Sequence, residues 1–306
     1  MKYHFIVNAK SRSGMGGMAW KMLEPELKKR RTDYLCHLTE RKGHAKKIAA
    51  QITEDGKKHT LIVMGGDGTV NEVINGIADP SKVMFGYIPI GSSNDFARGL
   101  GLEKDPLKAL NIILKPTKIT ELDLGELRNR AGSRRFAVSA GIGFDAAVCH
   151  EVCVSKWKVL LNRIGLGKLS YAVVALDRLK KDRTVKMKVR LSDGTEQVFE
   201  KTYFAAFMNL PYEGGGFKFC PDASPSDGIL DIIVVHGITV PKTLFLLPLA
   251  FAGKHVGFRG ITFLKCAGAD VEADVPMPLH TDGEPGFPRK EISVCFTGVR
   301  MNVITR

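Results

Sequence analysis

Residues 59–77, HTLIVMGGDGTVNEVINGI, place an apolar strand, a glycine-rich loop and an amphipathic helix in succession. The apolar residues of the helix recur at the spacing of one helical face: Val70, Val73, Ile74 and Ile77. We expect this face to cover a sheet, which puts GGDGT at a helix N-terminus, where free N–H groups favour an anion. Asp67 fits a phosphate site if a cation such as Mg²⁺ comes with the phosphates. The simpler alternative is a tight turn in which Asp67 caps the helix.

Two more polar loops follow apolar strands. SRSGMGGM (11–18) comes after HFIV, and GSSNDFARGLG (91–101) comes after VMFGYIPI. Strand, loop and helix in alternation predict a parallel sheet with helices on its faces, and ligands of such sheets bind at the carboxyl ends of the strands. Asp95 and Arg98 are expected to pair and fix the third loop. There is no GxxxxGK[ST], and Gly14, Gly16 and Ala19 spell GxGxxA too far from their strand for a dinucleotide turn.

The pattern changes after about residue 125. TVKMKVRL (184–191) alternates apolar and basic residues, and SDG turns the chain into EQVFEKTYFAAFMNL, which predicts a hairpin with one solvated face. Further strand patterns predict an antiparallel β-sandwich, interrupted by one helical insertion at 155–181. We therefore expect an α/β domain at 1–125, a sandwich at 126–295, and a C-terminal segment at 296–306 that packs back on the first domain.

Composition narrows the class. The 306 residues are 44% hydrophobic and 25% charged, as in soluble globular proteins, and the net charge of +13 favours anionic partners such as nucleotides or acidic lipids. The sequence contains no motif of alternating aromatic and basic residues of the kind that stacks on nucleic-acid bases, so nucleic acid is not the expected partner. Six cysteines without a CxxC pair and no signal peptide predict a cytoplasmic protein. The apolar run at 244–253 is too short to span a membrane and reads as core or an acyl-chain pocket.

GGDGTVNEVINGI, GSSNDFARGLG, NAKSRSG and the late TDGEP together resemble the bacterial diacylglycerol kinase catalytic-domain family, whose relatives include sphingosine and ceramide kinases. The resemblance implies the NAD-kinase-like fold, with a nucleotide-binding α/β domain, a β-sandwich that binds the lipid, and an active site in the cleft between them. It also implies that ATP is bound by these residues: Asn8, Ser11, Arg12, Ser13, Gly14, Thr39, Gly65, Gly66, Asp67, Gly68, Thr69, Val70, Asn71, Glu72, Ser92, Ser93, Asn94 and Asp95. NAKS and GSSND depart from the family's usual NP and GTxND, although Ser keeps the hydroxyl.

The resemblance implies two further sites. CPDASPSDGILDIIVV (220–235) resembles a regulatory magnesium loop, with Asp227 as side-chain ligand, Ser224 and Ile229 as carbonyl ligands, and Asp123 connecting the metal to the active site. In TDGEP (281–285), Asp282 or Glu284 is implied as the base that accepts the proton of the lipid hydroxyl, and we favour Glu284. Without the resemblance, both segments read as turns. Lys10, Arg12 and Arg98 are candidates to neutralise the triphosphate.

The function predicted is therefore an ATP- and Mg²⁺-dependent lipid kinase that transfers the γ-phosphoryl group to a lipid hydroxyl, with diacylglycerol as first candidate. It would act in the cytoplasm and transiently at the inner face of the membrane, where the apolar and basic insertion 155–181 is a candidate docking segment. That insertion could equally pack on the sandwich. An NAD kinase-like enzyme and a catalytically silent lipid-binding regulatory protein stay as alternatives. The sequence does not determine which lipid is the acceptor, whether ATP or GTP is the donor, or whether the protein is a monomer or a homodimer.

Overall fold

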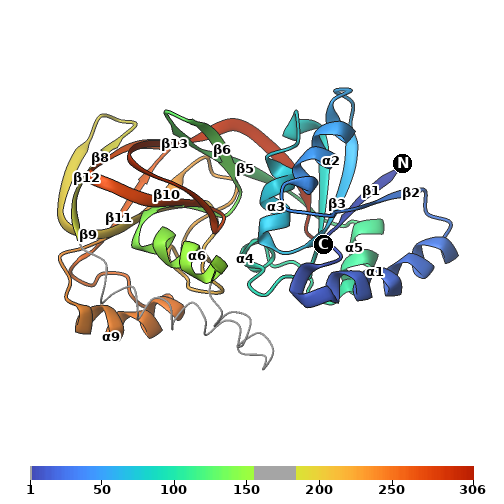
Figure 1. Cartoon of the computed structure of the whole chain (residues 1–306), viewed down its shortest axis with the longest axis horizontal. Coiled ribbons are helices and arrows are strands. Elements are labelled where there is room, and N and C mark those ends of the chain that lie inside the picture. The colour runs from blue at the N-terminus through green and yellow to red at the C-terminus, as the bar shows by residue number, and fades with distance from the viewer. Residues whose placement is uncertain (1, 155–183) are drawn as a thin grey trace. The chain divides into compact units, whose positions relative to one another are not determined.

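The computed structural model describes residues 2–154 and 184–306, so the insertion 155–181 lies entirely outside the described residues. The chain divides into two compact units. The first contains Met1–Leu124 and Gly298–Arg306, and the second contains Gly125–Thr297. Each unit is described by itself below, with the elements labelled as in Figure 1.

The first unit alternates strands and helices along the chain. Its elements are β1 (Tyr3–Val7), α1 (Ser11–Lys29), β2 (Tyr34–Leu38), α2 (His44–Thr53), β3 (His59–Gly65), α3 (Asp67–Ile74), a 3-10 turn (Pro80–Lys82), β4 (Val83–Pro89), α4 (Asp95–Gly99) and α5 (Pro106–Leu114). The strands pair in parallel in the order β4, β3, β1, β2, and the end of β13 (Glu284–Ile304) adds in parallel beside β4. The predicted parallel sheet is confirmed.

Helices cover both faces of this sheet (Figure 1). On one face, α1 and α5 bury Trp20, Leu23 and Leu110 against the strands, together with Phe5 and Met64. Successive residues of a strand point to opposite faces of the sheet. The strand residues that do not face α1 and α5 therefore pack against α2 and α3 on the other face. The predicted apolar face is buried, since all four of its members are at most 2% exposed: Val70, Val73, Ile74 and Ile77. The first three belong to α3, whereas Ile77 follows the end of the helix.

Three histidines gather on adjacent strands of this unit. His4 Nδ1 lies 3.3 Å from His37 Nε2, and the rings of His4 and His59 meet edge to face at 5.6 Å. Burial lowers the pKa of His4, with His37 and His59 adding to the effect, and burial also lowers the pKa of His37. Both rings are therefore held in the neutral form.

The neutral histidines make stability depend on pH. Because the folded-state pKa values lie below the unfolded value of about 6.5, the unfolded chain takes up protons first as pH falls. We expect the urea midpoint to decrease between about pH 7.5 and about pH 5.5, and His4→Gln to flatten that decrease. Urea titrations of both proteins at the two pH values test this. An equal decrease in His4→Gln would contradict it.

The second unit consists mainly of antiparallel strands. Its elements are β5 (Ile119–Asn129), which begins in the first unit, β6 (Gly132–Phe136), β7 (Ser139–Gly143), α6 (Phe144–Val154), β8 (Val185–Leu191), β9 (Glu196–Met208), β10 (Leu230–His236), α9 (Val240–Phe251), β11 (Ile261–Cys266), β12 (Gly268–Thr281) and most of β13. The strand order is β11, β10, β9, β7, β12, β13. In addition, β8 pairs with β9 and β12, and β5 pairs with β6 and β13. The hairpin predicted from the SDG turn is β8–β9, in the predicted antiparallel pairing.

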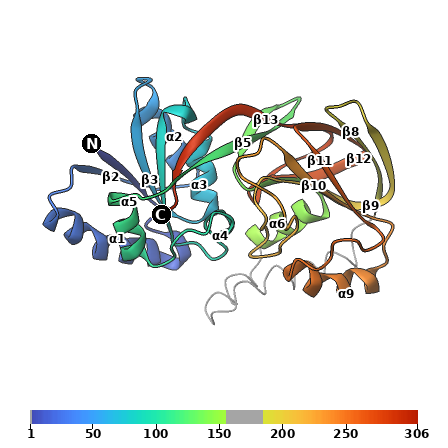
Figure 2. The same cartoon turned by 180° about the vertical axis from the view of Figure 1, so that it is seen from behind.

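This unit has two apolar clusters. One fills the sandwich between the strands and includes Phe136, Phe207 and Ile292. The other, including Phe204 and Leu246, lies between β9 and β10 and the helices α6 and α9 (Figures 1 and 2). Residues of β9 are buried on both faces because they alternate between the two clusters.

The sequence analysis expected a single helical insertion in the second half, and that expectation was wrong. Residues 240–251 form α9, which buries Leu246 and Ala250 but leaves Phe245 61% exposed. Pro248 did not prevent the helix, although it removes one backbone donor. Within the described residues, no helix is both long enough and apolar enough to span a membrane.

Candidate active site

The GGDGT loop joins β3 to α3 as predicted. Gly65 ends the strand and Asp67 begins the helix. Asn8, just after β1, donates from Nδ2 to Thr69 Oγ1 at 3.1 Å, which connects the first loop to the GGDGT loop. A Cβ on Gly65 would lie 2.6 Å from the same Oγ1, so only glycine leaves room for this threonine.

The GGDGT and GSSND loops touch through their backbones. A Cβ on Gly91 would lie 2.6 Å from Gly66 Cα, and one on Gly66 would lie 3.2 Å from Gly91 Cα. Tyr87, on β4, donates to the carbonyl of Gly65 at 3.0 Å and has Asn94 Oδ1 at 3.2 Å. Burial raises the pKa of Tyr87 well above its ordinary value, with contributions from Asp67 and Asp95, so the phenol stays a donor. These contacts bring two predicted phosphate loops into one surface.

Asp67 connects the starts of two helices. It is the first residue of α3, and its Oδ1 accepts a hydrogen bond from the Phe96 N–H of α4 at 3.2 Å. Asp95 is 7% exposed and lies 3.8 Å from Arg98 Nε, which confirms the predicted ion pair. A carboxylate is therefore held next to backbone N–H groups, an arrangement suited to a phosphate that arrives with a cation.

The N-terminal loop has an unusual backbone. Arg12, Ser13 and Gly14 all have positive φ, at 46°, 57° and 96°, so α1 becomes regular only after Gly14. Consecutive left-handed non-glycine residues are strained, and such strain gathers at binding sites. Lys10 Nζ donates to the carbonyl of Glu40 at 3.1 Å, which connects this loop to the segment after β2, where Thr39 lies.

Glu72 has a structural role that the sequence analysis missed. Its Oε1 accepts from the Gly43 N–H at 2.7 Å and its Oε2 from the Ala45 N–H at 3.2 Å. The carboxylate of α3 therefore caps the beginning of α2. The KGHA segment at 42–45, which has no Ser, Thr, Asp or Asn, could have indicated that the cap comes from elsewhere.

In the second unit, TDGEP forms the turn of the β12–β13 hairpin. Asp282 and Gly283 have φ of 51° and 75°, as a two-residue turn with left-handed central residues requires. The Asp282 carboxylate accepts from three consecutive backbone N–H groups, those of Ala137, Val138 and Ser139, at 2.8–3.1 Å. Asp282 is therefore an anchor of the turn, whereas Glu284 opens β13 beside it.

A buried cluster behind the turn was not predicted. His280 Nε2 lies 3.1 Å from Asp145 Oδ2 and 3.2 Å from Glu213 Oε1, and all three residues are at most 6% exposed. The Gly283 N–H donates to His280 Nδ1 at 3.2 Å. An accepting Nδ1 puts the imidazole proton on Nε2, facing both carboxylates. His280 thus connects the turn to α6 and to the loop after β9.

The cluster holds its protons tightly. Burial would lower the pKa of His280, but Glu213 and Asp145 raise it to about 10. Burial raises the pKa of Asp145, whereas His280 lowers that of Glu213 against the effect of burial. Because the Gly283 N–H donates to Nδ1, His280 carries a single ring proton, on Nε2. We place the second proton of the cluster on Asp145, and we assign the raised pKa to the three coupled groups together. Cys149 Sγ lies within 4.8 Å of the ligand atoms of Glu213 and His280, a spacing that would suit a metal ion. Because Nε2 of His280 carries a proton, we interpret the group as hydrogen-bonded and not as a metal site.

Three cavities lined by described residues of the second unit bear on the site. One of about 270 Å³ is lined by Glu284, His280, Arg134 and Arg289. A second, of about 90 Å³, is lined mainly by aromatic and aliphatic side chains with Asp145 and Glu213 at its wall, and residues Thr243 and Leu247 of α9 contribute to it. The run at 244–253 therefore lines a cavity in part and is exposed in part.

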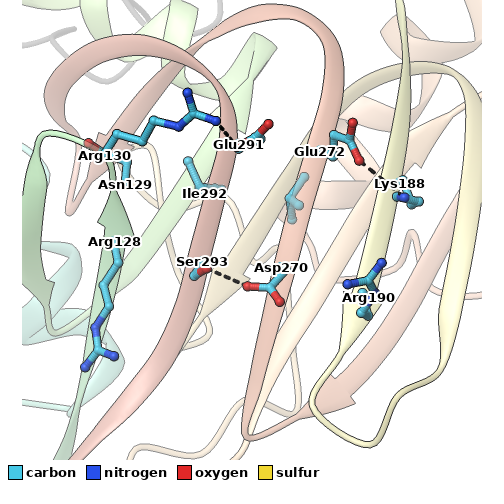
Figure 3. A pocket seen from close by; sticks show the side chains of 11 residues that line it. Arg128, Asn129, Arg130, Lys188, Arg190, Asp270, Glu272, Glu291, Ile292 and Ser293 are labelled. Atoms are coloured by element: carbon cyan, nitrogen blue, oxygen red, sulfur yellow. Dashed lines mark hydrogen bonds and ion pairs between the residues drawn. The ribbon is translucent and has the colours of Figure 1, made fainter.

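The third cavity is a groove of about 400 Å³ on the outer face of β5, β13, β12 and β8 (Figure 3). Its cations are already paired: Arg130 with Glu291 at 3.2 Å, Lys188 with Glu272 at 3.2 Å, Arg190 with Glu196 at 3.0 Å, and Arg128 with Glu126. Ser293 Oγ contacts Asp270 across the groove (Figure 3). Because carboxylates neutralise these cations, the groove offers little net positive charge to an anion.

The predicted magnesium residues lie in different units. Ser224, Asp227 and Ile229 share the loop before β10, where Asp227 Oδ1 accepts from the Ile229 N–H at 3.0 Å. Asp123, on β5 in the first unit, accepts from Arg300 Nε at 2.7 Å. The sequence analysis did not identify Arg300 as a partner of Asp123.

Comparison with known proteins supplies the family. The diacylglycerol kinase catalytic domain model matches residues 2–127, and the YegS C-terminal NAD kinase beta sandwich-like domain model matches residues 137–293. The chain belongs to the bacterial diacylglycerol kinase catalytic-domain family. Its fold is accordingly an NAD-kinase-like α/β domain followed by an antiparallel β-sandwich, as the resemblance implied.

Individual relatives agree with this family. The chain is 33% identical to "Putative lipid kinase YtlR" of Bacillus subtilis, over 92% of this chain and 93% of that one, and 31% identical to a diacylglycerol kinase of Mycobacterium tuberculosis, over 74% of each. A solved structure titled as a putative diacylglycerol kinase from Bacillus anthracis has a TM-score of 0.79 at 25% identity, covering 100% of this chain and 97% of that one. An NAD kinase from Archaeoglobus fulgidus in complex with ATP has a TM-score of 0.56 at 10% identity, covering 100% and 94%, a likeness of fold alone.

Proposed function

We propose that this family member is an ATP- and Mg²⁺-dependent lipid kinase that transfers the γ-phosphoryl group to a lipid hydroxyl, with diacylglycerol as first candidate and phosphatidic acid as product. The observation that carries the proposal is the backbone contact between Gly66 and Gly91, which joins two loops predicted to bind phosphate, next to Asp67. Family membership supports a kinase, and the ATP complex of the structurally similar NAD kinase supports ATP as donor. Residues 1–125 would bind the nucleotide and 126–295 the lipid.

Each group in the first unit has a distinct proposed task. The N–H groups at the start of α3 would bind phosphate oxygens, and the hydroxyls of Thr69 and Ser92 would orient them. Asp67 fits a Mg²⁺ ion because its carboxylate lies where phosphates would bind, and the ion would neutralise the charge that develops during transfer. Lys10, Arg12 and Arg98 would add positive charge.

The base is assigned by the different surroundings of the two carboxylates. Three N–H donors on Asp282 stabilise its carboxylate and occupy both oxygens, which suits an anchor. Glu284, which lines the cavity of about 270 Å³, would accept the proton of the lipid hydroxyl as the oxygen attacks the γ-phosphorus. ADP is the leaving group, and the proton ends on Glu284.

Transfer of labelled γ-phosphate tests the function directly. We expect label from ATP, with Mg²⁺, to appear in a lipid from a panel in mixed micelles that includes diacylglycerol, phosphatidylglycerol, a sphingoid base and ceramide. NAD is included as a soluble acceptor. Label in NADP would assign the protein to NAD kinase chemistry, and ATP binding without any labelled product would support a lipid-binding regulatory protein instead.

The loop before β10 gives a separate metal prediction. Asp222 and Asp227 help to raise the pKa of Asp231, after burial, so carboxylates gather where the regulatory Mg²⁺ is proposed, with Lys265 2.9 Å from Asp231. We expect Asp227→Asn to shift the Mg²⁺ dependence of transfer to higher concentration, because one ligand charge is lost. A Mg²⁺ titration of rate for wild type and Asp227→Asn checks this. An unchanged titration would remove the regulatory site.

A further inference from the structure

Two irregularities interrupt the β12–β13 pairing, and an exposed apolar side chain lies in each. Met277 pairs with Arg289, and the register shifts on both sides of that pair. Between Glu272 and Met277 the extra residues are on β12, and between Gly286 and Arg289 the extra residue is on β13. Bulges of this kind redirect side chains next to functional sites. Here they leave Val275 45% and Phe287 81% exposed.

Phe287 stands at the cavity that holds Glu284. The cavity is lined by Phe287, Arg134 and Arg289 as well as by Glu284. Phe287 is also the most exposed of the large hydrophobic residues among those described. A phenylalanine exposed to water beside this cavity stabilises neither core of the unit, so we look for its role in a contact outside the folded chain.

Basic residues surround these apolar side chains. The β5–β6 hairpin at 126–135 carries four arginines and one glutamate, and 284–291 carries Arg289 and Lys290 with two glutamates. The two segments are adjacent, because β5 pairs with β13 and Arg130 reaches Glu291 at 3.2 Å (Figure 3). Six cations against three carboxylates give this surface a positive surplus.

We propose that a rim made of Arg134, Val275, Phe287, Arg289 and Lys290 rests on a membrane surface that contains anionic lipids, with Phe287 inserted among the head groups. Exposed apolar and basic side chains side by side are what an anionic interface binds. The proposal deepens the proposed function and rests on it, because it brings the cavity of Glu284 to the layer in which a lipid hydroxyl lies. The proposal places membrane docking on the sandwich strands, whereas the sequence analysis considered the insertion 155–181.

Vesicle binding tests the rim independently of catalysis. The full chain is sedimented with phosphatidylcholine vesicles that contain or lack phosphatidylglycerol. We expect binding only to the anionic vesicles, about fivefold weaker in Lys290→Gln, since each cation near such a surface contributes about 1 kcal/mol. Phe287→Ser should weaken binding roughly tenfold. Phe245→Ser, which changes another exposed phenylalanine at 61% exposure on α9, and Lys21→Gln on α1 are the matched controls.

The outcomes separate docking from catalysis. Wild-type-like vesicle binding by both Phe287→Ser and Lys290→Gln would overturn the rim, and so would an equal loss in Phe245→Ser. Binding of single-stranded DNA that the rim variants weaken, with vesicle binding unchanged, would overturn it in favour of nucleic acid. If the rim variants lose vesicle binding while the wild type phosphorylates no lipid, docking stands and the proposed function fails. Transfer to a water-soluble short-chain diacylglycerol should be retained in Lys290→Gln, because Lys290 does not line the cavity of Glu284.

Discussion

Asp67→Asn is expected to lower the rate of phosphoryl transfer by about 10²–10³-fold, the range for losing one preorganised electrostatic group of an active site. The amide oxygen of asparagine can still accept the Phe96 N–H, so the contact between α3 and α4 survives. What the variant lacks is the negative charge proposed to hold Mg²⁺ at the phosphates. The measurement is the initial rate of labelled lipid formation at saturating ATP, with thermal unfolding alongside.

Asp105→Asn is the matched control for that variant. Asp105 likewise lies at the start of a helix and accepts a backbone N–H, that of Lys108 at 2.9 Å, but it belongs to the exposed start of α5. Its transfer rate and unfolding temperature should equal those of the wild type. A fully active Asp67→Asn would refute the assignment of the GGDGT loop as the phosphate site.

Glu284→Gln is expected to lower kcat by about 10²–10⁴-fold, the contribution of a positioned general base, with little change in stability. Asp282→Asn should behave differently. Asparagine tolerates the left-handed backbone at this position but has a single acceptor oxygen for three N–H donors, so unfolding free energy should fall by about 1–3 kcal/mol. Urea unfolding and steady-state kinetics on both variants separate the roles.

The opposite result for the two variants would exchange the roles of Asp282 and Glu284. Loss of transfer in Asp282→Asn at wild-type stability, with Glu284→Gln still active, would make Asp282 the base and Glu284 a residue of the cavity wall. Isosteric amides are used because each keeps the size of the side chain it replaces. A difference between the variants therefore reports charge and proton transfer, not lost packing.

The local geometry of the GGDGT and GSSND loops could be predicted because it depends on residues close in sequence. An apolar strand, glycines and a periodic apolar face determine where Gly65 ends β3 and where Asp67 begins α3. The Asp95 and Arg98 pair also follows from spacing, since residues three apart on a helix are neighbours. The contacts between loops required the fold: Gly66 meets Gly91 through the parallel register of β3 and β4, and Asn8 reaches Thr69 from a different strand end.

The turn at 281–284 could not be understood from its own residues. The sequence shows a DG turn, but the donors to Asp282 come from residues 137–139, and the partners of His280 are Asp145 and Glu213. These contacts join segments far apart in the chain, for which no spacing rule exists. The helix α9 was missed for a related reason: its short apolar run has no clear helical pattern of its own, and packing on β9 and β10 stabilises it.

The buried cluster around His280 also bears on how the hairpin finds its pairing. Two bulges interrupt β12–β13, so the alternation of apolar residues along these strands specifies their alignment less strictly than in a regular ladder. A slip of β12 by one residue would carry the imidazole to the opposite face and leave Asp145 and Glu213 buried without their donor. Leaving a buried charge uncompensated costs several kcal/mol, on the order of 3–5. The cluster therefore selects one alignment of the two strands, and with it the position of every residue in the turn that follows.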